Sequence, residues 1–411
     1  MPKRQKLWIV TEPFYPEDEG VGYYMSQYAF GLVKDMDVSA ITVQPSYAKK
    51  GTKCPNYEIH NQVEIFRCWA TQFDRQRIFL RLINLLTMSF SMFFCMLWRV
   101  RRKDVVLVAS SPPMLPFLAI IACFLKQAKS VIYLYDLYPD IAVVGGVLKE
   151  KSFVAKILNR VTKYFYQKAN MIFVLGRDMQ TLAQKRFRGN NLFIHYVPIL
   201  VDTEEIQPQR RDENELINSL NLKNNFVVQL AGNLGFIHDV ELFLNVAKTL
   251  EDTPDIKFLL FCSGKKLHHV EKVAREENRS NIIIHPRLPR EKTCEIVNAC
   301  DISFSSLFIP GMYGLASPSR TYAILAAGKP QLAITEDGTE VALLIQEEKI
   351  GWQVKPRDVD GTVAAIRDAY TRRFELNEMQ QAARKIAETQ YDKKVILRQM
   401  AELLTPLLCW K

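Results

Sequence analysis

The sequence lacks the cysteine spacing of a metal site. Its eight cysteines form no Cys-x-x-Cys pair, and several stand inside apolar runs, where a free cysteine packs as a small hydrophobic residue. The sequence also lacks low-complexity segments and repeats of solenoid length. We therefore expect no zinc site, no other metal and order nearly throughout.

The N-terminus lacks a long apolar run. The apolar residues that follow MPKRQK end at Thr11 and Glu12, too soon for a secretory signal peptide. A strand-like segment follows directly instead. We therefore expect a cytoplasmic protein.

Acidic residues are scarce in the first half of the chain. Residues 1–205 hold 27 Lys and Arg against 17 Asp and Glu, whereas residues 206–411 hold 27 against 27, so the whole excess of ten positive charges lies in the first half. Such asymmetry indicates an anionic partner, which could be nucleic acid, a membrane surface or a phosphate-bearing substrate. Charge alone does not choose among the three.

What the chain does contain is a repeated rhythm of short β-rich apolar runs. Most are separated by stretches long enough for helices, which is typical of parallel sheets. The runs in the first half are Leu7–Thr11, Val38–Val43, Val63–Arg67, Val105–Ala109, Val131–Tyr135 and Met171–Leu175. After a polar segment the rhythm restarts with Phe226–Ala231, Lys257–Cys262, Asn281–His285, Asp301–Ser305, Gln331–Thr335 and Trp352–Val354.

The length of 411 residues exceeds what one core usually organises, so two α/β domains are expected. We predict two Rossmann-like, doubly wound domains that face each other across a cleft, over residues 1–205 and 206–392. Residues 393–411 are predicted to form a terminal helix that returns to the first domain. Ligand groups are expected at the carboxyl ends of the strands of both sheets.

One stretch departs from this rhythm. Ile78–Trp98 holds 21 residues with one charge, Arg81, and is long enough to span a bilayer. Cations bracket it on both sides: Arg75, Arg77, Arg99, Arg101, Arg102 and Lys103. We favour a helix in the membrane interface, with Phe94 and Trp98 on its apolar side and Arg99, Arg101 and Arg102 near anionic head groups. A buried core helix and a true span are the alternatives.

Three segments have the composition of phosphate-binding turns. The first predicted strand leads to Gly20 and Gly22, and the seventh ends at Gly232 and Gly235 before a helix near Asp239. Each pair is equally compatible with an ordinary turn.

The third segment, 317–330, reads SPSRTYAILAAGKP. It predicts a short helix with Ser317 as N-cap, Pro318 in the first turn and Gly328 as the stop. The free N–H groups, the Ser319 hydroxyl and the Arg320 guanidinium would suit a diphosphate, although a well-capped structural helix explains the same pattern.

Several stretches together resemble glycosyltransferase family 4, and especially its bacterial members that build exopolysaccharide or O-antigen. They are LWIVTEPFYPEDEGVGYYM, YDLYPDIAVVGGVL, VPILVDTEEIQP, AGNLGFIHDVELF and ASPSRTYAILAAGKP, and they follow the family's order over most of the chain. The resemblance implies a retaining, metal-independent GT-B enzyme. Its partners would be a nucleotide diphosphate sugar, a lipid-linked or glycan acceptor and the inner face of the cell membrane.

The chain departs from the family at the donor site. The family's paired glutamates, eight residues apart, are replaced by Leu315 and Ala323, and its Arg and Lys after the second-domain glycine by Asn233 and His238. The donor set expected here is therefore Gly22, Gly232, Asn233, Gly235, His238, Lys265, Arg287, Ser319 and Arg320, with Lys266 as a further cation and Glu340 for hydroxyl contacts.

Asp136 is the first candidate for a catalytic carboxylate. It follows the strand-like run Val131–Tyr135, at the edge where α/β sheets present ligand groups, although an Asp before Tyr-Pro also suits a turn. The resemblance favours the catalytic reading, because the family often carries a His-Asp pair here, and Tyr135 stands in the His position. Glu12 and Glu17 on the first loop are the fallback carboxylates, although both are equally compatible with solvated loop charges.

Two other functions compete with glycosyl transfer. A nucleotide-sugar epimerase of the same fold would not need the basic, apolar first half. A non-enzymatic membrane-binding or nucleic-acid-binding protein would use only that half. The stripe of alternating basic and aromatic residues typical of single-strand binding is not evident, so nucleic acid is not expected as a partner.

Overall fold

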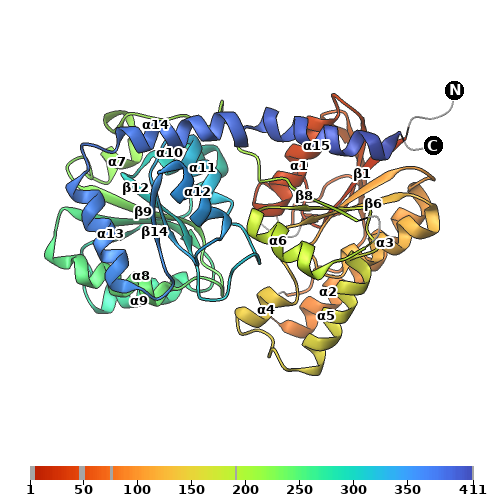
Figure 1. Cartoon of the computed structure of the whole chain (residues 1–411), viewed down its shortest axis with the longest axis horizontal. Coiled ribbons are helices and arrows are strands. Elements are labelled where there is room, and N and C mark those ends of the chain that lie inside the picture. Colours follow the sequence, from red (N-terminus) through yellow and green to blue (C-terminus); the bar gives the residue numbers. More distant parts are fainter. Residues whose placement is uncertain (1–4, 46–50, 75–76, 190–191, 410–411) are drawn as a thin grey trace. The chain divides into compact units, whose positions relative to one another are not determined.

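The computed structural model describes residues 5–45, 51–74, 77–189 and 192–409. The chain forms two compact units, each a mostly parallel sheet between helices (Figure 1). Unit 1 comprises Met1–Pro139, Glu150–Pro198 and Ile396–Lys411, and unit 2 comprises Asp140–Lys149 and Ile199–Val395. The mixed α/β prediction with two parallel sheets is confirmed.

The sheet of unit 1 has the strand order β3-β4-β2-β1-β5-β6-β7-β8, and only β3 is antiparallel to its neighbour. All six strands predicted for this half are present. The bounds are β1 Lys6–Val10, β2 Asp37–Val43, β3 Tyr57–His60, β4 Val63–Cys68, β5 Val105–Ala109, β6 Lys129–Leu134, β7 Met171–Val174 and β8 Phe193–Tyr196. The two strands that sequence reasoning missed, β3 and β8, are the edge strands. They have four residues each and are only partly buried, so they carry a weak apolar signal.

The helices of unit 1 are α1 Gly20–Leu32, α2 Ile78–Arg99, α3 Leu115–Lys126, α5 Phe153–Tyr166 and α6 Arg177–Arg186. The final helix, α15 Lys393–Leu408, contributes Ile396 and all following residues to this unit. Leu397 of α15 packs directly on α1, because a Cβ built on Gly31 would overlap the Leu397 side chain.

The sheet of unit 2 is wholly parallel, in the order β11-β10-β9-β12-β13-β14. All six strands predicted for this half are present. The strands are β9 Phe226–Asn233, β10 Ile256–Ser263, β11 Ile282–Ile284, β12 Ile302–Leu307, β13 Gln331–Ile334 and β14 Gly351–Val354. The α-helices are α4 Asp140–Val144, α7 Glu215–Ser219, α8 Val240–Thr249, α9 Leu267–Glu276, α10 Thr293–Asn298, α11 Arg320–Ala326, α12 Glu340–Glu348, α13 Val359–Thr371 and α14 Asn377–Ile386.

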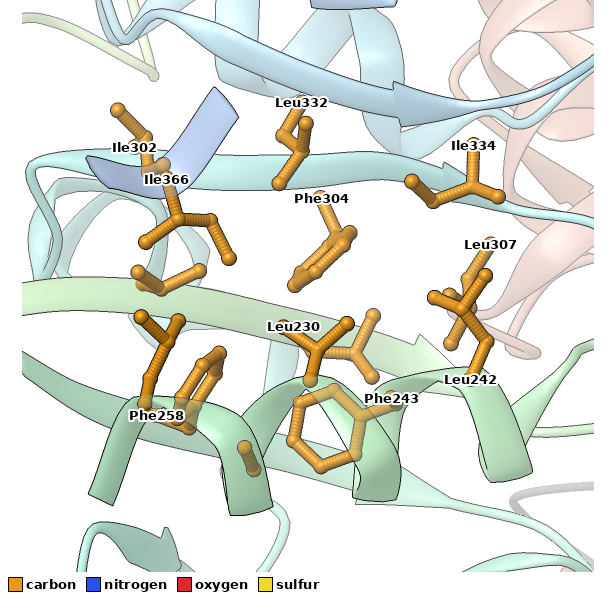
Figure 2. Close-up of a cluster of buried hydrophobic side chains, with 14 of the residues drawn as sticks. Leu230, Leu242, Phe243, Phe258, Ile302, Phe304, Leu307, Leu332, Ile334 and Ile366 are labelled. Carbon is orange, nitrogen blue, oxygen red and sulfur yellow. The ribbon is translucent and has the colours of Figure 1, made fainter. Parts of the chain in front are cut away.

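Alternation along β9 explains why this sheet is covered on both faces. Val228 and Leu230 belong to the larger core, with α8 and α13, whereas Val227 belongs to a second cluster with α7. Successive side chains of a strand point to opposite faces, so a run of apolar residues buries both. Figure 2 shows the larger core, in which Phe243 of α8 lies below Leu230 and Phe304 of the sheet.

Helix α11 corrects one prediction. It begins at Arg320, with Ser319 as N-cap and no side-chain capping bond, not at Pro318 after a Ser317 cap. The predicted stop is confirmed, because Gly328 has φ +63° directly after the C-cap. The helix predicted near Asp239 is also confirmed: the Asp239 side chain caps α8 by accepting from the N–H of Leu242.

Helix α2 has apolar residues on two opposite sides. One side packs against the rest of unit 1, and the other is exposed. Its buried residues include Met88, Met92 and Met96, and it packs against α3 and against strands β2 and β4. The other side exposes a stripe of large apolar residues: Phe79, Leu82, Leu86, Phe90, Phe94 and Trp98. Within the described chain it is the one helix long and apolar enough to cross a bilayer, and 28% of its most apolar window is buried. The core-helix alternative describes the packed side of α2, and the opposite side is exposed. Arg75, one of the predicted flanking cations, lies outside the described residues.

Candidate functional sites

Each sheet has one topological switch point, where strands that follow in the sequence are added on the opposite side of the first strand. In unit 1 it lies between β1 and β5, and in unit 2 between β9 and β12. In open α/β sheets the loops at the carboxyl ends of these two strands separate and leave a crevice for ligands. The predicted catalytic residues lie in unit 1 and, apart from Gly22, the predicted donor residues lie in unit 2.

In unit 2 the edge brings together Gly232 at the end of β9, His238 in the following loop and Arg320 at the start of α11. Arg320 Nη2 lies 3.3 Å from His238 Nε2. A Cβ built on Gly232, where φ is +123°, would stand 3.1 Å from Arg320 Nη2. Gly232 is therefore required both for its backbone conformation and for the close approach of the guanidinium.

The hydrogen bonds of His238 define its tautomer. The N–H of Gly235 donates to His238 Nδ1 at 3.1 Å. Burial, helped by the charges of Arg320 and Lys266, lowers the pKa of His238 to about 3, so the ring is neutral at neutral pH. A neutral imidazole that accepts at Nδ1 carries its proton on Nε2. Two N–H donors, from His238 and Arg320, therefore face the same space with no acceptor between them.

Arg320 itself lacks the usual partner of a buried cation. Its Nη1 is buried without a hydrogen bond, and within the described chain no carboxylate pairs with it. The Ser317 hydroxyl, three residues earlier in the sequence, is also buried without a hydrogen-bond partner. A guanidinium in this state costs free energy unless an anion satisfies it. The Arg320 guanidinium and the adjoining His238 ring thus form a donor-rich site suited to phosphate oxygens.

The other predicted donor residues lie around this centre at different depths. Lys266 donates to the carbonyl oxygens of Phe236 and His238, at 3.2 and 2.6 Å, and so fixes the loop after β9. Asn233 lies against Gly264, where φ is +102° and an added Cβ would overlap Asn233 Oδ1. Ser319 is the N-cap of α11.

Three further predicted donor residues lie on elements other than the end of β9 and the start of α11. Lys265 is exposed beside Lys266. Arg287 follows β11, the edge strand, and is exposed. Glu340 begins α12 after β13, the strand next to β12, and is 4% exposed.

In unit 1 Asp136 lies in the loop at the carboxyl end of β6, two residues after Leu134, where that strand ends. The Ser110 hydroxyl at the end of β5 accepts from the N–H groups of Tyr135 and Asp136, at 3.0 and 3.2 Å, and so fixes the backbone of the loop. Burial raises the pKa of Asp136 to about 6. No cation or hydrogen-bond donor within the described residues reaches its carboxylate. A carboxylate with such a pKa is suited to accept a proton near neutral pH.

The other residues predicted from the first loop have structural tasks. Glu12 follows β1 and is 5% exposed, and its carbonyl oxygen accepts from the Thr42 hydroxyl at 2.7 Å. Gly22 lies in the first turn of α1, not in the loop before it. A Cβ there would stand 2.8 Å from Pro13 Cβ, so Gly22 permits the loop to pack on the helix.

The residues predicted for a membrane contact lie on one part of unit 1. Phe94 and Trp98 of α2 are 64% and 83% exposed, and Arg101 and Arg102 follow the helix at the surface. Arg99 is half-buried, with Cζ 3.6 Å from the centroid of the Phe66 ring. Arg99 is thus partly committed to the sheet, which the charge pattern alone did not indicate.

Sequence reasoning missed the roles of two serines. Ser110 organises the Asp136 loop, and Ser317 is buried without a partner beside α11. The available signal was their position after β5 and β12, where ligand-facing loops were expected. Proline follows both serines within one or two residues, and a serine close before a proline is also typical of turns and helix caps.

No protein-family model matches the chain. In sequence it is similar to the probable glycosyltransferase WbjE of Pseudomonas aeruginosa, with 28% identity over 310 residues that cover 75% of this chain and 76% of the relative. The similarity extends over about three quarters of both chains.

Solved structures of the same architecture cover nearly the whole chain. Sucrose-phosphate synthase from Thermosynechococcus elongatus has a TM-score of 0.73 at 14% identity, and the match covers 98% of this chain and 99% of that one. HepE of Anabaena, in complex with UDP and glucose, has a TM-score of 0.71 at 14% identity, with 98% and 100% covered. WaaG, a glycosyltransferase involved in lipopolysaccharide biosynthesis, has a TM-score of 0.69 at 14% identity, with 97% and 99% covered. The fold is that of the GT-B glycosyltransferases.

Proposed function

We propose that this chain is a glycosyltransferase that moves a sugar from a nucleoside diphosphate sugar to an acceptor hydroxyl in cell-surface polysaccharide or glycolipid biosynthesis. The similarity to the probable glycosyltransferase WbjE and the GT-B fold support the reaction class. The observation that carries the donor assignment is the unpaired guanidinium of Arg320, which faces the Nε2–H of His238.

The donor diphosphate is assigned to the β9–β12 edge of unit 2. Its oxygens would accept from Arg320, from His238 Nε2 and from the Ser317 hydroxyl, all of which lack an acceptor. Gly232 leaves space beside the guanidinium, and Lys266 adds positive charge. When the bond between the sugar and the diphosphate breaks, the nucleoside diphosphate leaves with the bonding electrons. Hydrogen-bond donors placed at its oxygens therefore stabilise the transition state as well as the bound donor.

Asp136 is assigned as the group that orients or deprotonates the acceptor hydroxyl. Its raised pKa and the absence of a competing cation among its described neighbours support this role. Arg320 and Lys266 provide the positive charge that a metal ion provides elsewhere, so we expect transfer without a metal. Within the described chain no cluster of three potential metal-binding side chains is present. Chelation with EDTA should leave turnover unchanged.

The acceptor is proposed to be lipid-linked, because unit 1 has an exposed apolar face. This face is made of α2, α3 and α5, which pack in that order. Its large exposed side chains include Trp98 of α2, Phe124 of α3 at 81% and Phe153 of α5 at 77% exposure. Exposed aromatic residues in such numbers are costly in water and mark an interaction surface.

Basic residues surround the same apolar face. Arg101 and Arg102 follow α2, Lys126 ends α3, and α5 exposes Lys156, Arg160 and Lys163. Aromatic side chains inserted at the head-group level, together with flanking cations, are typical of interfacial membrane binding. We therefore place the enzyme in the cytoplasm, peripherally bound to the inner face of the cell membrane through this face of unit 1.

The central test is incubation of the purified protein with a panel of nucleotide sugars, with and without a bacterial lipid extract, while the nucleoside diphosphate is measured. Release that depends on one sugar donor and on the lipid fraction supports the proposal. Conversion of the nucleotide sugar to an epimer without release of nucleoside diphosphate would indicate an epimerase. Binding to vesicles with no turnover of any donor would indicate a non-enzymatic protein.

A finer proposal is that transfer retains the anomeric configuration, as in glycosyltransferase family 4. The motif order supports it, although Leu315 and Ala323 stand where that family has paired glutamates. The NMR coupling constant of the newly formed glycosidic bond distinguishes the two outcomes. An inverted anomer would exclude the family 4 mechanism and leave the glycosyltransferase assignment intact.

A further inference from the structure

A polar clamp holds the chain segment that precedes α2 against that helix. The segment is residues 69–73, which follow β4, and it meets Asn84 and Thr87 of α2. Asn84 Oδ1 accepts from the N–H of Phe73 at 3.0 Å, and Asn84 Nδ2 donates to the Phe73 carbonyl oxygen at 3.0 Å. The Thr71 hydroxyl donates to Asn84 Oδ1 at 2.8 Å and forms a second hydrogen bond, also of 2.8 Å, with the Thr87 hydroxyl. These polar residues within the apolar run of α2 therefore fix residues 69–73.

The clamp has an energetic consequence for α2, because Asn84 is only 8% exposed. A buried amide that loses its hydrogen-bond partners costs free energy, and the cost is larger in a hydrocarbon medium. If α2 left the sheet to cross a bilayer by itself, the Asn84 amide would lose the Phe73 peptide group and the Thr71 hydroxyl. The hydrogen bonds therefore favour a state in which α2 and residues 69–73 stay together.

The clamp places residues 69–73 beside the exposed apolar stripe of α2. Thr87 precedes Phe90 by three residues and Phe94 by seven, and residues at these spacings lie on the same side of a helix. The clamped segment also exposes aromatic side chains of its own: Trp69 is 69% exposed and Phe73 is 45% exposed. Residues 69–73 thus widen the exposed apolar surface along one flank of the stripe.

Both ends of α2 carry cations and return to the same sheet. Arg77 and Arg81 are exposed at the start of the helix, and Arg101 and Arg102 are exposed just after its end. Strand β4 precedes the helix and β5 follows it, and both belong to the sheet of unit 1. The ends of a helix that crossed a bilayer would be separated by about 30 Å of hydrocarbon. Cations at both ends instead complement one anionic surface that runs along the length of the helix.

We propose that α2 lies flat in the head-group layer of an anionic membrane, and that residues 69–73 form a second anchor beside it, positioned by Asn84. This inference rests on the membrane contact proposed above, and it specifies which residues enter the membrane surface and in which orientation. Trp69 and Phe73 enter together with the apolar stripe of α2, because aromatic side chains favour the level of the head groups. Asn84 keeps its hydrogen-bond partners within the protein.

The first test measures tryptophan quenching in the full chain by brominated phospholipids, in vesicles of phosphatidylglycerol and phosphatidylethanolamine. W98F keeps Trp69 as the reporter, W69F keeps Trp98, and W69F/W98F gives the background from the remaining tryptophans. We expect bromines close to the head groups to quench both reporters above this background. F90W, added to W69F/W98F, reports on the middle of α2 and should also be quenched most by bromines close to the head groups. Strongest quenching of this reporter by bromines at the acyl-chain ends would indicate a spanning helix and overturn the flat orientation.

A second measurement tests the clamp. N84L replaces the amide with a side chain of similar volume and removes its hydrogen bonds to residues 69–73. In W98F/N84L the quenching of Trp69 should fall toward the background, whereas in W69F/N84L the quenching of Trp98 should persist. T71V removes a hydroxyl from the segment, leaves the sequence of α2 unchanged and should act in the same direction. S89A is the matched control, because Ser89 of α2 is fully buried and its hydroxyl has no hydrogen-bond partner among the described residues.

W69S/F73S should also weaken vesicle binding at least about tenfold in co-sedimentation, because two large apolar side chains no longer leave water. The inference is overturned if Trp69 is not quenched while Trp98 is, or if N84L leaves the quenching of Trp69 unchanged. It is also overturned if wild type is a dimer that W69S/F73S converts to a monomer, since a second copy would then cover this surface. Failure of wild type to sediment with vesicles at all would remove the membrane contact proposed above as well. Release of nucleoside diphosphate with a detergent-solubilised acceptor tests glycosyl transfer separately.

Discussion

Arg320 and His238 determine the charge of the proposed donor site. A neutral imidazole beside an unpaired guanidinium keeps one net positive charge and two converging N–H donors at the end of β9. Such a site binds an anion by completing hydrogen bonds that the protein leaves open, not by competing with an existing ion pair. The affinity for a diphosphate is therefore expected to depend strongly on Arg320.

Replacing Arg320 with alanine should weaken nucleoside diphosphate binding roughly tenfold or more, because a hydrogen bond to a charged group contributes about 1.5–3 kcal/mol. Isothermal titration calorimetry with the free nucleotide measures this directly. Lys265→Ala is the matched control, since Lys265 is an exposed neighbouring cation with no recorded contact to Arg320. Unchanged nucleotide affinity in R320A, with acceptor binding lost instead, would assign Arg320 to the other substrate.

His238 should make the stability of unit 2 depend on pH. Its pKa of about 3 in the folded protein is below the usual value near 6.5, so the unfolded chain binds more protons between these values. Stability from His238 is therefore present above pH 6.5 and is lost as the pH falls toward 3, by at most about 1.4 kcal/mol per pH unit. Urea denaturation of H238N between pH 6.5 and 4.5 should show a smaller loss than wild type. Parallel slopes for the two proteins would contradict the buried, neutral imidazole.

Asp136 should control turnover. General base assistance contributes roughly 10²–10⁴-fold, so Asp136→Asn should lower kcat by about that factor with little change in donor affinity. In wild type kcat should fall as the pH drops through about 6, and this limb should be absent from the residual activity of the variant. Turnover within a few fold of wild type, in a variant that still melts cooperatively, would remove Asp136 from the mechanism and make Glu12 the next candidate.

Helix α2 packs against the rest of unit 1 on one side and exposes large apolar side chains on the other. Its methionines pack on α3 and the sheet, and its aromatic stripe faces away from them. Spacings of three and four residues between Phe79, Leu82, Leu86, Phe90, Phe94 and Trp98 place these side chains on one helical face. The sequence run is apolar throughout because both sides need apolar residues, for different reasons.

The variant F94S/W98S should bind anionic liposomes at least tenfold more weakly than wild type, because each large apolar side chain contributes about 1.5–3 kcal/mol when it leaves water. R101Q/R102Q should lose roughly 2 kcal/mol, or about 30-fold, at low salt and less at high salt. R372Q/R373Q, an exposed pair in unit 2, is the matched control. Unaltered co-sedimentation of both α2-region variants would mean that this face binds something other than a membrane.

At the scale of the whole molecule, the basic excess and the donor site are in different units. The ten excess positive charges lie within residues 1–205, mostly in unit 1, whereas the Arg320 cluster lies in unit 2. The basic excess therefore lies mainly in the unit that has the exposed apolar face. We assign this basic excess to binding of the anionic membrane surface and of the lipid-linked acceptor.

Nucleotide specificity should appear as thermal stabilisation. A ligand that binds only the native state at a concentration of 100 Kd stabilises it by about 2.7 kcal/mol, so the preferred nucleoside diphosphate should raise the melting temperature of unit 2. Parallel melts with UDP and GDP should show a shift for one of them and a smaller shift in R320A. Equal shifts for wild type and R320A would mean that the diphosphate binds elsewhere.

Much of the architecture follows from the sequence alone. The twelve predicted strands are all present, because runs of β-branched and aromatic residues buried on both faces of a parallel sheet produce a strong local signal. The helix ends at Asp239 and Gly328 were also predicted from the sequence, because helix capping depends on residues that are close in the chain. The partly polar edge strands β3 and β8 gave too weak a signal, and Ser317 proved not to be the N-cap of α11.

The tertiary structure alone decided which distant groups meet. No local pattern indicates that Arg320 faces His238 or that Asp140–Lys149 groups with unit 2. It also produced the raised pKa of Asp136 and the lowered pKa of His238, since burial is a sum over contacts from many segments. Sequence determines which residue types stand at the ends of strands; their reactivity depends on neighbours that only folding brings within a few ångströms.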